Sequence, residues 1–340
     1  MSVIKISALS ETAIKFQKEF AMLPFAVMAE ELGRHGITLF PDVQNKHIIT
    51  EYLRKQGIAR PYSTSVNLEH QTEIADAKEK VLEVLTAYAS VKDNLKNYQT
   101  IGIGMDTLLG KNQTKKHPLE KEIIATIIRT FGEDLLDATF GATRDIADQS
   151  PLGLMDGYDK KIDDAISSGE IAVSKGNLVS TGAIVAPSDE DDYTAFEQVL
   201  AFWRSGHALM RSKNSLLLIP YDIYNYVCDA HFNKFKSKPS EDSWGMAVLP
   251  GTGGKCKMVP SNIMGNGDRI QLVIPGIMDF GMNSMGDADF VQVRNVDEDP
   301  NVAQFWIQGD YGTRYRTFHS KMFQVNDGTP AGVQLSGDYS

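Results

Sequence analysis

PLEKEIIATIIRTFGEDLLDA, residues 118–138, is the stretch that decides the fold. Its apolar residues recur at the spacing of one helix face, which predicts an amphipathic helix over the whole stretch. Pro118 suits the first turn, where proline costs no hydrogen bond, and Glu120 and Glu122 lie near the positive end of the helix dipole. The apolar stripe consists of Leu119, Ile123, Ile124, Ile127, Ile128, Phe131, Leu135 and Leu136. It is the clearest helix of the sequence.

The sequence after this helix mixes helices with strands. SPLGLMDGYDKKIDDAISSGEI (150–171) predicts a loop and then a shorter helix from about Met155 to Ser168. Residues 171–187 are polar with short β-prone runs, and a further helix follows the acidic cluster at 188–192. SLLLIP (215–220) is typical of a buried strand, and YDIYNYVCDAHFNKF (221–235) of a helix.

The last third predicts short strands. They are GMAVLP (245–250), CKMVPS (256–261), RIQLVIPG (269–276), FVQVRNV (290–296), AQFWIQGDYG (303–312) and RYRTFHSKMFQV (314–325). The tail, 326–340, is expected to pack poorly.

The N-terminal third is less regular. A helix is expected to begin near Ser10, to kink or break near Pro24, and to end at Gly33 and Gly36. Residues 36–68 hold two short β-prone runs and read as a loop-rich excursion. Residues 70–98 have Ile74, Val81, Leu82, Leu85, Tyr88, Val91 and Leu95 near one helical face, which predicts an amphipathic helix. Residues 101–118 are glycine-rich and basic, and a loop is expected there.

Charge and cysteine content narrow the functional classes. The 34 basic and 44 acidic residues give a formal charge of −10, which disfavours a protein dominated by contact with nucleic acid or anionic membranes. Cys228 and Cys256 allow at most one disulfide bond. No apolar run reaches the ~20 residues of a membrane span, and the first residues lack the apolar core of a secretory signal. The chain is therefore expected inside a cell, at least at first.

Two glycine-rich motifs fail as nucleotide-binding loops. PGTGGK (250–255) has Leu249 where a phosphate loop needs glycine, and Cys256 where it needs Ser or Thr to reach magnesium. A tight turn between two strands is the better interpretation. Gly102-Ile103-Gly104 has threonine at the third glycine position and no preceding strand, so we expect a hinge loop.

The remaining candidates are weaker still. Ser188–Asp192 lacks the glycine and distal glutamate of a calcium loop, so we expect it to cap a helix. Cys228, His231 and Cys256 offer three soft ligands where structural zinc needs four; a Cys/His nucleophile pair is the other option, and a buried structural cysteine is the simplest. The other histidines form no recognisable constellation: His35, His47, His70, His117, His207 and His319. The sequence therefore predicts no catalytic, cofactor-binding or metal-binding residues and no cofactor.

The order of features, together with three stretches, carries a resemblance. The first is the long helix followed by LMDGYDKKIDDAI (154–166). The second is Trp203-Arg204 on a helix, followed by the segment from Ser215 to Tyr224. The third is VPSNIMGNGDRI (259–270) with FWIQGDYGTRY (305–315). Together, across roughly residues 118–325, these stretches resemble the major capsid proteins of tailed bacteriophages, which share the Hong Kong 97-type fold.

The resemblance implies an α+β chain with an N-terminal arm, an extended loop, a peripheral domain with a long spine helix, and an axial domain. The implied boundaries are an arm with a helix at 1–35, an extended loop region and accessory helix at 36–117, a peripheral domain at 118–190, an axial domain at 191–285, and peripheral strands with the tail at 286–340. The helix expected over 70–98 is an additional element beyond those that the family minimally requires.

The implied function is a non-enzymatic structural protein that self-assembles, as hexamers and pentamers, into the icosahedral shell around the phage genome. Implied partners are further copies, scaffolding, portal and decoration proteins, and double-stranded DNA enclosed without sequence-specific binding; no membrane is involved. The implied location is the virion capsid, assembled in the bacterial host cytoplasm. Because no long charged leader precedes the fold, we expect scaffolding to come from a separate protein. The alternatives are an α/β enzyme with an unrecognised active site and another virion or sheath-like interaction protein.

Basic residues in the excursion add one hypothesis about assembly. Lys46, Arg54, Lys55 and Arg60 stand out in an otherwise acidic chain. They are candidates to meet acidic segments such as 188–192 on an adjacent subunit. Solvated surface charge is the simpler interpretation.

Overall fold

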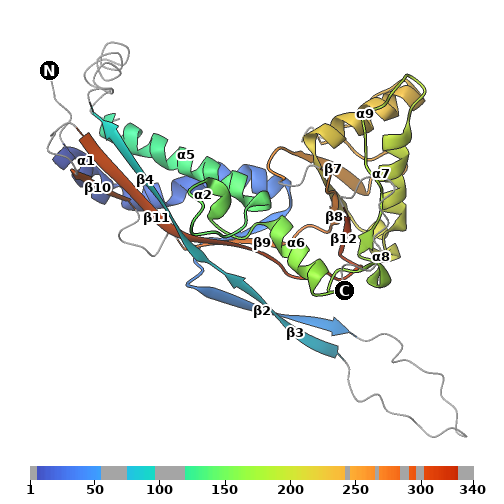
Figure 1. Cartoon of the computed structure of the whole chain (residues 1–340), viewed down its shortest axis with the longest axis horizontal. Helices are drawn as coiled ribbons and strands as arrows, with labels where there is room; N and C mark the ends of the chain where they lie inside the picture. Colours follow the sequence, from blue (N-terminus) through green and yellow to red (C-terminus); the bar gives the residue numbers. More distant parts are fainter. Residues whose placement is uncertain are drawn as a thin grey trace, which may run out of the picture.

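The structure, a computed structural model, describes residues 6–54, 75–95, 119–241, 246–264, 268–283, 291–295 and 302–327. Two lobes lie side by side along the long axis of the molecule, and a two-stranded hairpin projects away from them (Figure 1). Most of the buried apolar residues belong to a large hydrophobic core, and a second core fills the smaller lobe.

The helix predicted over 118–138 is confirmed as α5 (Leu119–Gly141). Most of its apolar stripe is buried: Ile128 and Leu135 are fully inaccessible, and Ile127 and Leu136 are partly buried. It packs against α2 (Gln17–Arg34), and α1 (Ile6–Lys15) lies against it as well. The three helices form one layer of the larger lobe (Figure 1).

The expectation that the helix breaks at Pro24 is wrong. The break falls at Phe16, between α1 and α2, and α2 continues through Pro24. Pro24 is buried, and its Cα lies 3.1 Å from the position that a Cβ would take at Gly132 of α5. Pro24 therefore lies at a point of close packing between the two helices. Gly36, with φ 71°, turns the chain just beyond the end of α2.

The larger lobe contains a sheet centred on β11 (Val302–Tyr315), a single strand where the sequence predicts separate runs. One side of β11 pairs with β10 (Val291–Asn295) and then with β9 (Met278–Met282). The other side pairs with β4 (Leu85–Asn94), since residues 303–307 pair with both β10 and β4. β1 (Ile37–Phe40) adds to β9 in parallel.

The helix predicted over 70–98 is wrong, because its described part is two strands. They are β3 (Ala75–Glu83) and β4, separated only by Val84. Leu82, Val84 and Ala87 are buried, whereas Tyr88 is 52% exposed, so burial does not follow a helix face. Ten consecutive residues of β4 pair with β11, and this non-local ladder overrides the local helical pattern.

The smaller lobe is built on a sheet of order β5-β12-β8-β6-β7. Its strands are β5 (Leu178–Val179), β6 (Ser215–Pro220), β7 (Cys256–Ser261), β8 (Gln271–Val273) and β12 (Phe323–Asn326). The buried strand predicted at 215–220 is confirmed. GMAVLP forms only isolated bridges through Ala247 and Val248 instead of the predicted strand.

Helices complete the smaller lobe. The helix predicted over 221–235 is confirmed as α9 (Tyr221–Phe235), which packs against α7 (Thr194–Ser205). The short α8 (Ala208–Ser212) follows α7, and His207 precedes it as its N-cap. The expected helix near 155–168 is α6 (Tyr158–Ser167), which lies between the lobes (Figure 1). Within the described ranges, no helix is long and apolar enough to cross a lipid bilayer.

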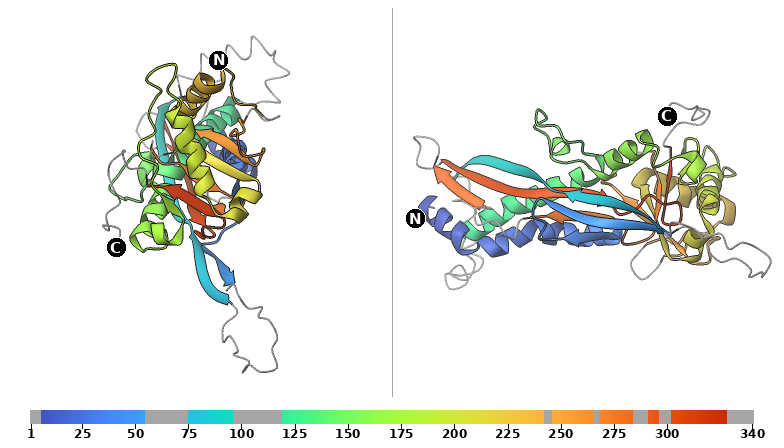
Figure 2. Two further views of the ribbon diagram at one scale, coloured as in Figure 1. Left: turned by 90° about the vertical axis from the view of Figure 1, so that its right-hand side faces the viewer. Right: turned by 90° about the horizontal axis from the view of Figure 1, so that it is seen from below.

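The projecting hairpin consists of β2 (Lys46–Arg54) and β3. The two strands pair antiparallel along their whole length, from Lys46 opposite Glu83 to Arg54 opposite Ala75. Figure 1 and the left view of Figure 2 show the hairpin leaving the body of the protein. The short strands expected within 36–68 are therefore β1 and β2.

Candidate functional site

The turn predicted at 250–255 is confirmed. Gly251, Gly253 and Gly254 all have positive φ, between 64° and 84°, which favours glycine. Thr252 Oγ1 donates to the carbonyl of Leu249 at 2.7 Å and closes the turn. Gly102-Ile103-Gly104 lies outside the described residues.

The cysteine and histidine candidates have structural surroundings. Burial raises the pKa of the Cys256 thiol to about 12, and burial also raises the pKa of Cys228, so both thiols are protonated at neutral pH. His231 Nδ1 lies 2.8 Å from the carbonyl of Ser237, just beyond α9, and its ring packs edge-on against Phe196. Across the part of the chain that the structure describes, no group of three or more His, Cys, Asp or Glu residues is placed to hold a metal ion.

The acidic cluster at 188–192 closes its own loop. Asp192 accepts hydrogen bonds from the backbone N–H groups of Ser188 and Thr194, both at 3.0 Å, and these bonds lower its pKa. Thr194 is the first residue of α7, so Asp192 satisfies an N–H at the helix start, although the N-cap itself is Tyr193. Asn233 ties the loop to α9 by donating to the carbonyls of Asp189 and Asp192.

The most distinctive polar constellation lies at the root of the hairpin. Arg314 of β11 forms a buried ion pair with Asp279 of β9: Nε lies 3.1 Å and Nη2 2.5 Å from Oδ2. Arg316 Nε approaches the other carboxylate oxygen at 2.8 Å. Nη1 of Arg314 donates to the carbonyls of His47 and Lys80, at 2.8 and 3.0 Å. One guanidinium therefore joins the sheet to both strands of the hairpin.

Close backbone packing supports the same root. A Cβ at Gly312 would lie 2.0 Å from the carbonyl oxygen of Glu83, at the end of β3. Gly281 packs against Leu82 in a similar way: a Cβ at Gly281 would lie 2.8 Å from Leu82 Cδ2. Leu82 and Val84 form a small buried cluster with Val43. The two glycines let the hairpin approach the sheet more closely than any side chain would allow.

A separate ion pair joins the hairpin to the loop after α6. Lys80 Nζ lies 2.5 Å from Oε1 of Glu170, and the Lys80 ammonium lies 5.0 Å from the ring centroid of Phe318. Both charged side chains are largely buried, at 16% and 27% exposed. Of the basic residues in the excursion, Lys46 pairs with Glu83 of the same hairpin. The side chain of Arg54, and residues Lys55 and Arg60, lie outside the described part of the chain.

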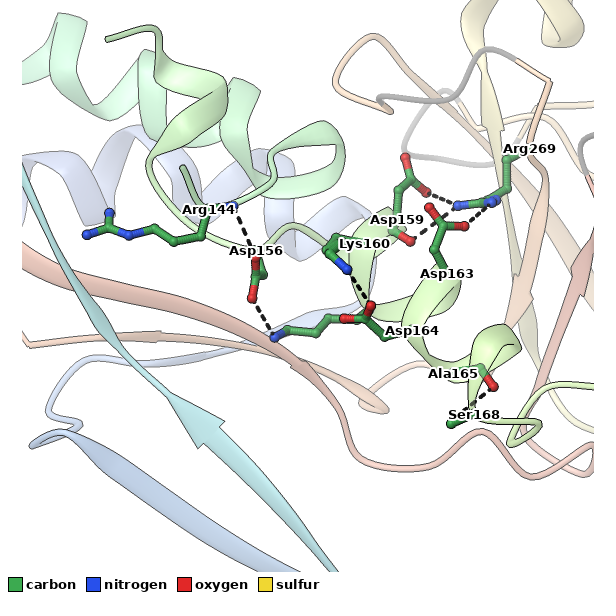
Figure 3. Close-up of polar contacts among 10 residues, drawn as sticks. Arg144, Asp156, Asp159, Lys160, Asp163, Asp164, Ala165, Ser168 and Arg269 are labelled. Carbon is green, nitrogen blue, oxygen red and sulfur yellow. Dashed lines mark hydrogen bonds and ion pairs between the residues drawn. The ribbon is translucent and has the colours of Figure 1, made fainter. Parts of the chain in front are cut away.

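A second, partly buried polar network joins the lobes through α6 (Figure 3). Arg269, just before β8, lies 3.4 Å from Asp159 and 2.6 Å from Asp163. Gln271 Nε2 donates to Asp159 Oδ1 at 3.4 Å, and Tyr315 of β11 donates to Gln271 Oε1 at 2.7 Å. Strands of both sheets are thus held to one helix.

A separate set of contacts, made by Asp156 and Tyr158, fixes the start of α6. Asp156 accepts from the backbone N–H of Arg144 at 3.0 Å (Figure 3) and from Lys161 Nζ at 3.2 Å. Burial raises the pKa of Asp156, but the hydrogen bond from the Arg144 N–H and the charge of Lys161 outweigh it and lower the pKa overall. Tyr158 donates to the carbonyl of Asp279 at 2.8 Å, which links this helix to the hairpin root.

Sequence reasoning did not assign these roles. Asp159 and Asp163 stand in DGYDKKIDD, Arg269 in GDRI and Arg314 in GTRY, all within the stretches that carried the resemblance. A charged residue inside a strand-like apolar run was the available signal, since such a residue needs a buried partner.

Comparisons with known proteins identify the fold. No protein-family model matches the sequence, and no curated protein matches it either. Among solved structures, a chain of the satellite phage P4 procapsid that includes the size determination (Sid) protein matches with a TM-score of 0.51 and 11% identity, covering 90% of this chain and 99% of that one. A chain of the cyanophage A-1(L) capsid asymmetric unit matches with a TM-score of 0.50 and 13% identity, covering 89% and 93%.

The chain is therefore a mixed helix-and-sheet protein with the fold of phage capsid proteins. The likeness extends over nearly the full length of both neighbours and is not confined to one lobe.

Proposed function

We propose that this chain is the major capsid protein of a tailed bacteriophage, and that it self-assembles into the icosahedral shell that encloses the phage genome. The observation that carries the proposal is the match to a procapsid chain, which covers 99% of that chain and 90% of this one. The role is structural and not enzymatic.

The proposed architecture is of the Hong Kong 97 type. The arm comprises residues 1–35, the extended loop residues 36–117, the peripheral domain residues 118–190 with α5 as spine helix, and the axial domain residues 191–285. Residues 286–340 supply peripheral strands and the tail. Two strands depart from these sequence boundaries: β9 pairs with β11 in the sheet of the larger lobe, and β12 pairs with β8 in the sheet of the smaller lobe.

The projecting hairpin is the proposed means of joining subunits. Ile48 and Val81, which pair across it, are 56% and 43% exposed. Apolar side chains on a projecting ribbon gain little from their own chain and are covered when the ribbon packs on a neighbour. Such contacts would join subunits head to tail into closed rings, which we propose are hexamers and pentamers.

Further partners are part of the same proposal. Scaffolding and portal proteins, and decoration proteins on the outer face, would bind the shell. The DNA would be enclosed without sequence-specific contacts, as suits a chain of net charge −10. Assembly would take place in the bacterial host cytoplasm, and the final location would be the virion capsid.

Negative-stain electron microscopy with light scattering tests the proposal. The chain is expressed alone and with the products of its neighbouring genes. Closed shells, tubes or stable rings are expected. A monodisperse dimer or tetramer under every condition would contradict the proposal and favour an enzyme instead.

A further inference from the structure

A groove follows one face of α7 in the smaller lobe and is here called the α7 groove. It has a volume of about 500 Å³. One wall is the face of α7 that carries Glu197, Leu200 and Arg204, and the other consists of the end of α9 and the turn at 250–251. Figure 1 shows α7 and α9 at the end of the molecule that lies away from α1. The groove therefore lies where a neighbouring subunit can reach it without passing the larger lobe.

The lining of the α7 groove combines apolar surface with a positive charge. Leu200 and Phe235 line it, at 8% and 53% exposed. Lys234 Nζ lies 2.5 Å from Glu197 Oε1, so these two charges neutralise each other. Arg204 is exposed, and among the described residues its guanidinium forms no ion pair. An anionic segment with apolar side chains therefore complements the groove.

The segment 185–193, VAPSDEDDY, has this complementary character. It carries four carboxylates and no basic residue. Glu190 and Asp191 are exposed, and neither forms an ion pair within the part of the chain that the structure describes. Val185 and Tyr193, at the two ends of the segment, are 59% and 41% exposed. The segment thus offers unpaired negative charge between two uncovered apolar side chains.

The segment holds its shape without a partner. Asp192 accepts from the backbone N–H groups of Ser188 and Thr194, both at 3.0 Å. Asn233 of α9 donates to the carbonyls of Asp189 and Asp192. A preformed loop loses little conformational entropy when it binds, which favours its use in a contact. The α7 groove of the same chain is lined by other residues, so the segment remains available to a neighbour.

We propose that the α7 groove receives the segment 185–193 of a second copy of this chain. The unpaired carboxylates of the segment would lie beside Arg204, and its exposed apolar side chains would cover Phe235. Because the groove and the segment are different surfaces, the contact is head-to-tail and can close into a ring. The proposal rests on the proposed function, since it assigns one contact between subunits of the proposed rings in addition to that of the hairpin.

Site-specific cross-linking between two full-length variants tests the proposal. One variant carries Ala201→Cys in the groove and the other Ala186→Cys in the segment, both with Cys228→Ser, and Cys256 stays buried. The variants are co-assembled, treated with a short bismaleimide and separated on a denaturing gel. A dimer that requires both introduced cysteines is expected. Ala147→Cys, at an exposed alanine in the loop after α5, replaces Ala201→Cys as the matched control and should give little dimer.

Charge variants test the recognition itself. In the groove variant, Arg204→Gln should lower the dimer yield roughly twofold to fivefold, as expected for a partly exposed ion pair. Arg211→Gln, at an exposed arginine of α8 outside the groove, should leave the yield unchanged.

A charge reversal on both sides separates recognition from a general loss of stability. Arg204→Glu in the groove variant and Asp191→Lys in the segment variant should each lower the dimer yield when present alone. When the two changed variants are mixed, the yield should recover, because opposite charges meet again. A variant that merely folded poorly would not be rescued by a change in the other copy.

Three outcomes would overturn the inference. They are equal cross-linking at positions 147 and 201, a paired charge reversal that does not restore the yield, and a product that contains another co-expressed protein in place of a second copy. If microscopy shows shells while any of these results is obtained, the capsid function stands and only the groove assignment fails. If no assembly forms and no dimer is trapped, both fail.

Discussion

Arg314 and Asp279 form a buried ion pair at the root of the hairpin, with neither side chain more than 3% exposed. The Arg314 guanidinium also donates to the carbonyls of His47 and Lys80, one on each hairpin strand. Arginine can do this because its five donors form a fixed, planar fork. The hairpin is therefore attached to the body by a side chain whose own charge is neutralised within the sheet.

Arg314→Met should destabilise the protein by about 3–5 kcal/mol, because it leaves a buried carboxylate without its main partner. The measurement is urea-induced unfolding. Arg316→Met is the matched control, since Arg316 binds the same carboxylate but is 34% exposed. It should cost no more than about 1 kcal/mol. Equal losses at the two positions would contradict the special role of Arg314.

Arg314→Lys separates charge from geometry. Lysine keeps the positive charge but lacks the fork, so it cannot bind Asp279 and both hairpin carbonyls together. We expect faster hydrogen exchange in residues 46–50 and 77–83, with little change in α9. Unchanged exchange in the hairpin would show that charge alone holds it.

Gly312→Ala should loosen the same root by a different route. The new Cβ would lie 2.0 Å from the carbonyl oxygen of Glu83, so strand β11 or the hairpin must move. A loss of about 1–3 kcal/mol in the free energy of unfolding is expected. Gly33→Ala, in an exposed helical position with nothing within 4 Å, should instead stabilise the protein by about 0.5–1 kcal/mol. Thermal unfolding of both variants provides the comparison.

These predictions concern residues that the sequence pattern left without a role. Their roles could not be predicted because they depend on pairing between strands that are far apart in the sequence. The stripe in 118–138 is helical both locally and in the fold, so α5 could be predicted from the sequence. Leu85, Tyr88 and Val91 also fit a helix, but they lie in β4, which gains its stability from β11, more than 200 residues away. A window of sequence contains no information about such a partner.

The same reasoning applies to the buried charges. Arg314 and Asp279 are 35 residues apart in sequence and adjacent only because β9 and β11 pair. The turn at 250–255 could be predicted, since its glycines take positive φ for local reasons.

The network between the lobes should depend more on Asp159 than on Asp163. Asp163 lies closer to Arg269, at 2.6 Å against 3.4 Å, but it is 56% exposed whereas Asp159 is 9% exposed. Water screens the exposed pair, so Asp163→Asn should cost less than about 1 kcal/mol. Asp159→Asn should cost about 1–3 kcal/mol, because buried donors from Arg269 and Gln271 lose a charged acceptor. Double-mutant cycles with Arg269→Met measure both couplings, and a larger coupling to Asp163 would refute the argument.

His35 should make the protein less stable below neutral pH. Burial lowers its pKa from the usual 6.5, with Arg34 acting in the same direction and Glu31 opposing it. Its Nδ1 lies 2.6 Å from the Glu31 carbonyl, and its ring packs against Phe140 of α5. The unfolded chain therefore binds a proton more readily than the folded chain, and stability rises with pH between the two pKa values.

The contribution of His35 is thus fully present above about pH 6.5 and is lost as the pH falls toward its lower folded pKa. Unfolding free energies at pH 7.5 and 5.5 measure the loss, and His35→Gln should make the difference between them smaller. Burial also lowers the pKa of His319, so His319→Gln serves as the comparison. It should have a smaller effect, because His319 is only partly buried whereas His35 is 1% exposed. An unchanged pH difference in His35→Gln would show that this histidine does not carry the acid sensitivity.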